Sequence, residues 1–219
     1  PPGSEGLAVE ALVGGPGIDP VTKTIVASLG PLALAAREGG ILLADEVNMW
    51  PPQVWGVTQA ALECPAKAIV IPEPYTVIPP AKGFVVGATC NDKGLGDDPG
   101  RYTGGHVMNA AQLDRFAVIK IDYLPEKAEK FILKKIDAGL SGKQINNMVK
   151  LAEKTRSGDA AADLTFALGH RTKIKWAEMS SLIGFGSSYI VNVANKTDNG
   201  TKQKLIELYQ RIMGELPTA

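Results

Sequence analysis

The chain has 219 residues, of which 45% are hydrophobic and 21% charged, as expected of a folded protein with one large domain or two small ones. Its 23 basic and 23 acidic residues cancel, so no overall charge draws it to nucleic acid or to an acidic membrane. Two cysteines without a CxxC spacing and two histidines support neither a zinc site nor a disulfide framework.

The beginning of the chain predicts a cytoplasmic protein. Residues 1–5, Pro-Pro-Gly-Ser-Glu, have neither the basic nor the apolar segment of a secretory signal. The longest apolar runs fall far short of the roughly 20 residues that a membrane-spanning helix needs. We therefore expect a cytoplasmic location and no membrane span.

The first 40 residues are rich in glycine, proline and alanine. The turn formed by residues 14–17, Gly-Gly-Pro-Gly, predicts a loop or a hairpin. Pro31 suits the first turn of a helix, and Gly39-Gly40 is typical of a helix end, so a short helix is expected between them.

Three apolar runs predict buried strands of a parallel sheet. The first, residues 41–44, ends in Asp45-Glu46, and we expect it to be buried on both faces. The second, residues 84–89, runs directly into Asn91, and the third covers residues 118–121. Ligands of open α/β sheets gather at such strand ends.

Between the first two strands, the sequence predicts a helix over residues 53–63 and a short hairpin. The hairpin would pair residues 68–71 with residues 75–78 and is interrupted by Pro72 and Pro74.

The character of the chain changes after Tyr123, where a series of charged amphipathic helices begins. We expect an α/β domain over residues 1–124 and an all-helical domain over residues 125–219. The predicted helices cover residues 125–138, 142–156, 169–184 and 199–214.

The pair Asp45-Glu46 is the main chemical signal in the sequence. An aspartate at a strand end can hold Mg²⁺ through the ion's water shell, and a neighbouring glutamate can polarise an attacking water. Asn91 ends the next parallel strand, so its amide could face the same site and orient that water. The alternatives are two solvated acids and an asparagine that stabilises a turn.

A series of motifs follows in a fixed order along the chain. The motifs are Gly30-Pro31-Leu32, Ile41 to Asn48, Pro51-Pro52-Gln53, Ala88-Thr89-Cys90-Asn91, Gly94-Leu95-Gly96-Asp97, Gln112 to Phe116, His170-Arg171-Thr172 and Trp176-Ala177-Glu178. Taken together, they resemble the MoxR-type AAA+ ATPases, and especially the small-subunit group of cobaltochelatase. The region around the first strand resembles a Walker B segment and its lead-in, and the later motifs resemble the cobaltochelatase group. The match covers roughly residues 11 to 180.

This resemblance implies a role for each matching position. Asp45 would assist Mg²⁺ and Glu46 would activate water, while Asn91 would be the sensor-1 residue. Arg115 matches the arginine finger that acts on a neighbouring subunit's nucleotide, and Arg171 matches sensor 2 in the helical lid. A planar guanidinium can meet phosphate oxygens in a bidentate way.

Outside the family context, both arginines have a simpler explanation. Surface arginines usually lie in water or pair with a carboxylate, and Asp114 stands beside Arg115.

The phosphate-binding loop departs from the family pattern. No GxxxxGK[ST] motif occurs, although the backbone amides and lysine of that loop hold the phosphates. Residues 17–24 imitate it, but they carry Pro20 and lie too close to Asp45. Pro1-Pro2-Gly3-Ser4 resembles the opening of such a loop, so Gly3 and Ser4 are assigned to nucleotide binding, and we expect the rest of the loop to be missing from this sequence. The alternatives are an engineered fragment and a tag remnant at residues 1–4.

The resemblance implies an AAA+ P-loop type of parallel sheet with flanking helices, followed by a small helical lid. The function it implies is Mg-ATP hydrolysis at the subunit interfaces of a homo-oligomeric, hexameric ring that acts on a partner protein or a metal-insertion complex. ATP and Mg²⁺ would be the cofactors. The segments over residues 14–29 and 69–78 would be family insertions that contact the client. The alternatives are an inactive scaffold that lacks the loop and an unrelated α/β binding domain.

Overall fold

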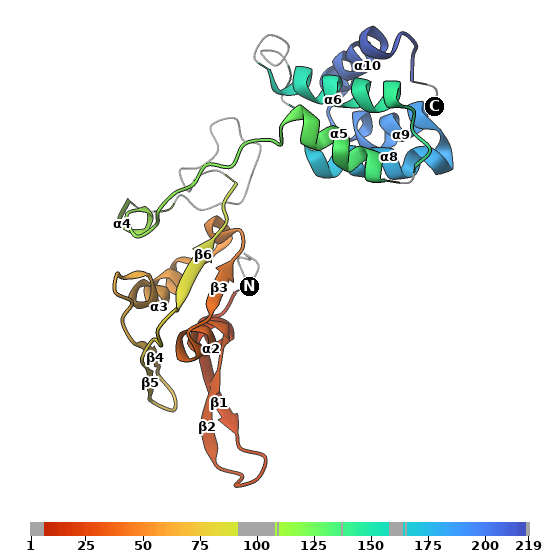
Figure 1. Cartoon of the computed structure of the whole chain (residues 1–219). Helices are drawn as coiled ribbons and strands as arrows, with labels where there is room; N and C mark the ends of the chain where they lie inside the picture. Colours follow the sequence, from red (N-terminus) through yellow and green to blue (C-terminus); the bar gives the residue numbers. More distant parts are fainter. Residues whose placement is uncertain are drawn as a thin grey trace. The chain divides into compact units, whose positions relative to one another are not determined.

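The computed structural model describes residues 7–91, 108, 110–136, 138–157, 164 and 166–217. The chain divides into two compact units, Pro1–Ile119 and Lys120–Ala219, which are described separately (Figure 1). This division falls a few residues before the boundary expected near residue 124. None of the helices in the described part of the chain has the length and apolar character needed to span a bilayer.

The first unit opens with a short helix and an antiparallel hairpin. Helix α1 (Val9–Val13) leads into strand β1 (Gly14–Ile18), which pairs with β2 (Ile25–Leu29). The Asp19 carboxylate closes the turn by accepting the N–H groups of Val21 and Thr22, both at 2.8 Å. The hairpin alternative for this segment is therefore confirmed (Figure 1).

Helix α2 (Pro31–Glu38) has the two boundaries that the sequence predicts. Pro31 lies in its first turn, and Gly39 ends it in the left-handed region, with φ 69°. A side chain at Gly39 would place its Cβ 2.5 Å from the carbonyl oxygen of Lys82, so glycine is required there. Strand β3 (Ile41–Ala44) follows at once.

Strand β3 pairs in parallel with β6 (Val85–Ala88), as expected. The expectation that β3 is buried on both faces is wrong. Leu42 and Ala44 are buried, but Ile41 and Leu43 are 74% and 61% exposed. The apolar core of this unit lies against one face of the strand, and nothing in the described residues covers the other face.

The segment between β3 and β6 follows the predicted order. A single 3-10 turn, η1 (Val47–Met49), precedes α3 (Pro52–Leu62). The predicted hairpin is confirmed as β4 (Ile69–Ile71) paired with β5 (Thr76–Ile78).

The predicted third strand is wrong. Residues 118–121 form no strand, and Val118, Ile119 and Ile121 are 66%, 83% and 89% exposed. An apolar run forms a strand only where another strand accepts its backbone hydrogen bonds, and no described strand pairs with it. The segment follows the short helix α4 (Ala110–Leu113).

The second unit is entirely helical in its described residues, which agrees with the predicted change of character. The sequence missed α9, because Gly184, with φ 87°, separates it from α8 without a long loop. The helices are α5 (Glu126–Lys135), α6 (Gly142–Arg156), α8 (His170–Ile183), α9 (Phe185–Asn192) and α10 (Asn199–Met213), with the 3-10 turn η2 (Ala194–Lys196) between the last two.

Aromatic rings form the centre of the helical core. Trp176 on α8 is fully buried and its ring centroid lies 5.0 Å from that of Tyr189, which lies 4.6 Å from that of Tyr209. The Trp176 indole donates to the carbonyl of Phe185 at 2.9 Å, so its polar atom is satisfied. This core fixes α8, which carries Arg171.

Replacing Ser141 with alanine is expected to lower the free energy of unfolding of the helical unit by about 1 kcal/mol. Ser141 caps α6: its hydroxyl accepts from the Gln144 N–H at 3.2 Å, and its own N–H donates to Gln144 Oε1 at 2.8 Å. Urea unfolding measures the loss. Ser141→Asp keeps an N-cap acceptor and should retain the stability; equal losses in both variants would contradict this account.

Candidate functional site

The parallel pairing of β3 and β6 brings two groups of polar residues to one edge of the sheet. The register places Ala44 opposite Ala88, and both strands end there. Asp45 and Glu46 follow β3, and Asn91 lies three residues beyond the end of β6. All three side chains are exposed at this edge, which is where ligands of parallel sheets bind.

Thr89 holds this edge together. Its N–H donates to the Ala44 carbonyl at 2.9 Å, and its carbonyl accepts the Val47 N–H at 3.0 Å. Its hydroxyl donates to Asp45 Oδ1 and accepts the Glu46 N–H at 3.0 Å. A single residue of the second strand therefore fixes the positions of both acids.

Glu46 has an unusual backbone conformation. Its φ of 51° and ψ of 50° lie in the left-handed region, which a residue with a side chain rarely adopts. Such a conformation costs free energy, and residues that adopt it cluster at active sites and switch regions, although Lys23 shares it in the turn between β1 and β2. Here it turns the chain directly from β3 into η1 and leaves the Glu46 carboxylate exposed to solvent.

The donor set fits a hydrated magnesium ion. Among the described residues, no group of three or more His, Cys, Asp or Glu side chains gathers to hold a metal. Mg²⁺ does not need such a group, because it keeps several waters and binds one or two carboxylates together with substrate phosphates. The exposed carboxylate of Asp45, fixed by Thr89, meets that requirement.

Arg115 lies on the first unit, paired with a carboxylate. Its Nη2 and Nε lie 3.1 and 3.2 Å from Glu63 Oε1, and its Nη1 donates to the carbonyl of Ala111. The carboxylate is therefore Glu63 and not the adjacent Asp114. Within the described part of the chain, these hydrogen bonds of Arg115 lead to α3 and α4 and not to Asp45 or Glu46.

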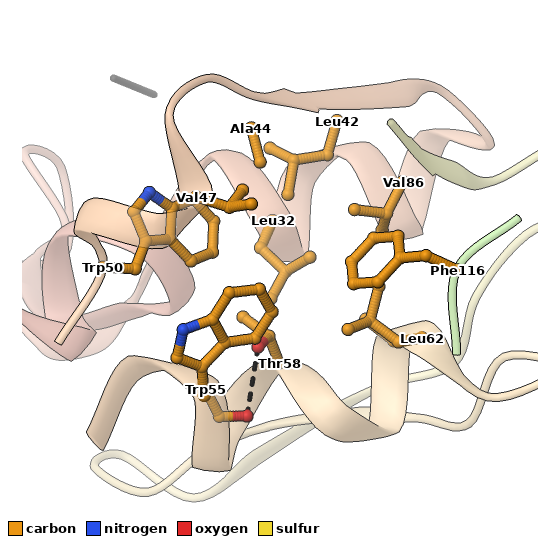
Figure 2. A pocket seen from close by; sticks show the side chains of 11 residues that line it. Leu32, Leu42, Ala44, Val47, Trp50, Trp55, Thr58, Leu62, Val86 and Phe116 are labelled. Atoms are coloured by element: carbon orange, nitrogen blue, oxygen red, sulfur yellow. Dashed lines mark hydrogen bonds between the residues drawn. The ribbon is translucent and has the colours of Figure 1, made fainter. Parts of the chain in front are cut away.

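Phe116 anchors the segment that carries Arg115, because its ring lines a small apolar cavity beneath β3 and β6 (Figure 2). The cavity holds only about 10 Å³, roughly the space of one water molecule. Phe116 packs there edge-on against Trp55, with ring centroids 6.3 Å apart. The Thr58 hydroxyl in the lining donates to the Trp55 carbonyl at 3.1 Å, and the other lining side chains are mainly apolar, so we interpret the cavity as core packing.

The remaining predicted residues lie elsewhere. Arg171 is exposed in the first turn of α8, in the helical unit, which is described separately from the unit that carries the acids. Gly3 and Ser4, assigned to the phosphate loop, lie outside the described residues.

The sequence has a clear relative among characterised proteins. It is 32% identical over 191 residues to the aerobic cobaltochelatase subunit CobS of a Sinorhizobium species, covering 84% of this chain and 57% of that protein. The chain belongs to the MoxR- and CobS-like AAA+ family. Its α/β unit with parallel strands, followed by a helical unit, agrees with the fold expected of this family.

Two further similar proteins add little to the family assignment. An uncharacterised protein of Staphylococcus aureus strain USA300 is 34% identical over 130 residues, covering 58% of this chain and 45% of that protein. A candidate ATPase of Cytophaga hutchinsonii with a crystal structure aligns with 97% of this chain and 67% of its own, at 18% identity and a TM-score of 0.46, which is too weak a likeness to add to the assignment. No protein-family model matches the chain.

This member of the CobS-like family spans little more than half the length of the cobaltochelatase subunit that it matches. The motifs alone did not indicate that Thr89 contributes to the site. The available signal was a hydroxyl residue at a strand end, opposite two acids. Glu63 gave no signal, because it lies 52 residues before Arg115.

Proposed function

We propose that this chain supplies the magnesium-holding, water-activating and sensing residues of an ATP-hydrolysing site. The chain would act as a motor module of a homo-oligomeric, hexameric AAA+ ring in the cytoplasm. Hydrolysis at the subunit interfaces would drive the remodelling of a partner protein or of a metal-insertion complex.

The observation that carries the proposal is the edge formed by Asp45, Glu46 and Asn91. The carboxylate of Asp45, fixed by the Thr89 hydroxyl, would hold Mg²⁺, which supplies charge neutralisation to the phosphates when bound. Glu46 would accept a proton from the attacking water, and the Asn91 amide would orient that water. The strained backbone of Glu46 supports a functional role for this residue.

The two arginines would complete the site from other places. Arg115 would reach the nucleotide of a neighbouring subunit, and Arg171 would contact the nucleotide from the helical unit. To act, Arg115 must leave Glu63. Their side chains are 27% and 33% exposed, so water can replace each partner as the pair separates.

The phosphates of ATP require a binding loop. We assign Gly3 and Ser4 to the first part of this loop. The sequence holds no complete GxxxxGK[ST] motif. This observation favours a second candidate function, an inactive AAA+ scaffold or interaction subunit. The similarity to a cobaltochelatase subunit makes metal insertion one of the tasks that the motor could serve.

Mg-ATP is expected to stabilise the protein, purified at its natural length, against unfolding. A ligand that binds only the folded state at 100 times its Kd adds about 2.7 kcal/mol to the free energy of unfolding. Thermal unfolding with Mg-ATP, with ATP plus EDTA, and without nucleotide measures the effect. A protein that carries the loop and shows no shift with Mg-ATP would favour the scaffold function.

A further inference from the structure

Three charged side chains meet inside the helical unit. Glu129 comes from α5, Arg156 is the last residue of α6, and Lys173 lies in the first turn of α8. Their side chains are only 1%, 10% and 0% exposed. We call these three residues the Glu129 cluster.

Glu129 joins the other two members. Its Oε1 accepts a hydrogen bond from Arg156 Nη1 at 3.0 Å, and its Oε2 forms an ion pair with Lys173 Nζ, in close contact but without hydrogen-bond alignment. One carboxylate thus connects the end of α6 to the beginning of α8. Lys173 is two residues after Arg171, within the same helical turn.

Arg156 extends the connection in two further directions. Its Nε donates to the carbonyl of Leu168, which precedes α8, at 3.0 Å. Its guanidinium also lies 3.9 Å from the ring centre of Tyr123, in the segment through which the chain enters the helical unit. The Leu168 N–H in turn donates to the Thr155 hydroxyl at 3.0 Å, so both sides of this residue are bound to the end of α6.

Stability alone does not explain the composition of the cluster. Two cations share one carboxylate in a buried environment, and burial lowers the pKa of Lys173 in spite of its contact with Glu129. Apolar side chains of similar volume often stabilise a protein as well as a buried ion pair does. Charged groups differ from them in fixing a single geometry, because their directions and partners are specific.

We infer that the Glu129 cluster is a positioning device that fixes the first turn of α8, and Arg171 on it, relative to the entry segment at Tyr123. A displacement of Tyr123 reaches α8 through directly contacting groups: the ring, the Arg156 guanidinium, the Glu129 carboxylate and the Lys173 ammonium. The further step, that the positioning of Arg171 affects ATP hydrolysis, rests on the proposed function, since it takes Arg171 as the nucleotide sensor. The mechanical connection between Tyr123 and α8 does not depend on the proposed function.

Hydrogen exchange tests the mechanical connection. Arg156→Lys keeps the charge but loses the planar contacts to Leu168 and Tyr123. It is expected to speed exchange about tenfold at the amides of residues 173–175, and to leave α10 unchanged. Tyr123→Leu removes only the ring from the half-exposed entry segment, and is expected to produce the same pattern at a smaller amplitude.

The controls are Arg211→Lys on the exposed side of α10 and Tyr75→Leu in the β4–β5 hairpin, which should leave the first turn of α8 unchanged. A rise in exchange of equal size across α6, α8 and α10 would show general destabilisation and overturn the inference. So would a rise that stays within residues 156–168 and never reaches α8.

Steady-state ATP hydrolysis by the natural-length protein tests the consequence for function. Arg156→Lys is expected to lower kcat/KM about tenfold, but to cause no further loss in an Arg171→Ala background, because it acts through Arg171. Additive losses would overturn the positioning role. If the wild-type protein does not hydrolyse ATP at all, the proposed function fails, and the exchange experiment alone decides the inference.

Discussion

Replacing Glu46 with glutamine is expected to lower the turnover of Mg-ATP by about 100- to 10,000-fold, the contribution of a positioned general base. The amide keeps the size of the side chain and its exposed position at the end of β3, but it cannot take a proton from water. The Glu46 N–H still donates to the Thr89 hydroxyl, so the strand edge should keep its shape. ATP binding should therefore persist while hydrolysis is lost.

Steady-state hydrolysis and equilibrium binding of ATP by the same preparations measure the two effects separately. The matched control is Glu73→Gln, an exposed glutamate in the turn between β4 and β5, which should hydrolyse ATP at the wild-type rate. If Glu46→Gln keeps more than about a tenth of the wild-type turnover, Glu46 is not the base, because a positioned base contributes more than that.

Glu129→Gln is expected to lower the free energy of unfolding of the helical unit by about 3–5 kcal/mol. The substitution leaves Arg156 and Lys173, two buried cations, without the carboxylate that pairs with both of them. Native-state hydrogen exchange at the most protected amides of α6 and α8 measures the loss. The control is Glu178→Gln, an exposed glutamate on α8, which should change stability little.

Lys173→Met provides the opposite comparison. It removes one cation and leaves Glu129 paired with Arg156, so its cost is expected to be well below that of Glu129→Gln. Equal losses in the two variants would contradict a cost that is set by the unpaired cations.

The Glu129 cluster also predicts that the stability of the helical unit depends on pH. Burial raises the pKa of Glu129, but Lys173 and Arg156 outweigh it, so the net pKa lies below its usual value. The stabilisation is therefore present above the unfolded-state pKa of about 4.3 and disappears as the pH falls through the lower folded-state value. Glu129→Gln should remove this part of the acid sensitivity.

The sequence predicted the elements whose signals are local. Pro31 and Gly39 mark the ends of α2 by their own backbone preferences, and the charged amphipathic pattern marks α5, α6 and α10. The placement of Asp45-Glu46 and Asn91 at one edge also follows from local signals, because two parallel neighbours end on the same side.

The errors concern features that depend on distant partners. The run over residues 118–121 has the composition of a strand but finds no strand to pair with among the described residues. The exposed face of β3, with Ile41 and Leu43, is apolar in sequence and uncovered in the structure. Composition specifies what a segment is able to bury, but only the tertiary structure determines what covers it.

Two ion pairs between distant residues were equally hidden from the sequence. The pairs Arg115–Glu63 and Arg156–Glu129 join residues 52 and 27 positions apart, and no local pattern links such positions. Arg171 was predicted to be a sensor residue from its motif alone, and this stays a prediction, whereas the Glu129 cluster, which includes Lys173 of the same helix, became visible only when the helices were packed.

Whether this CobS-like chain belongs to a working ATPase is best tested by ATP hydrolysis with the protein purified at its natural length and its intact mass measured on the same sample. We expect phosphate release that requires Mg²⁺ and a mass above the 23.1 kDa of this sequence. A protein that carries a complete phosphate loop and releases no phosphate from Mg-ATP would contradict this expectation.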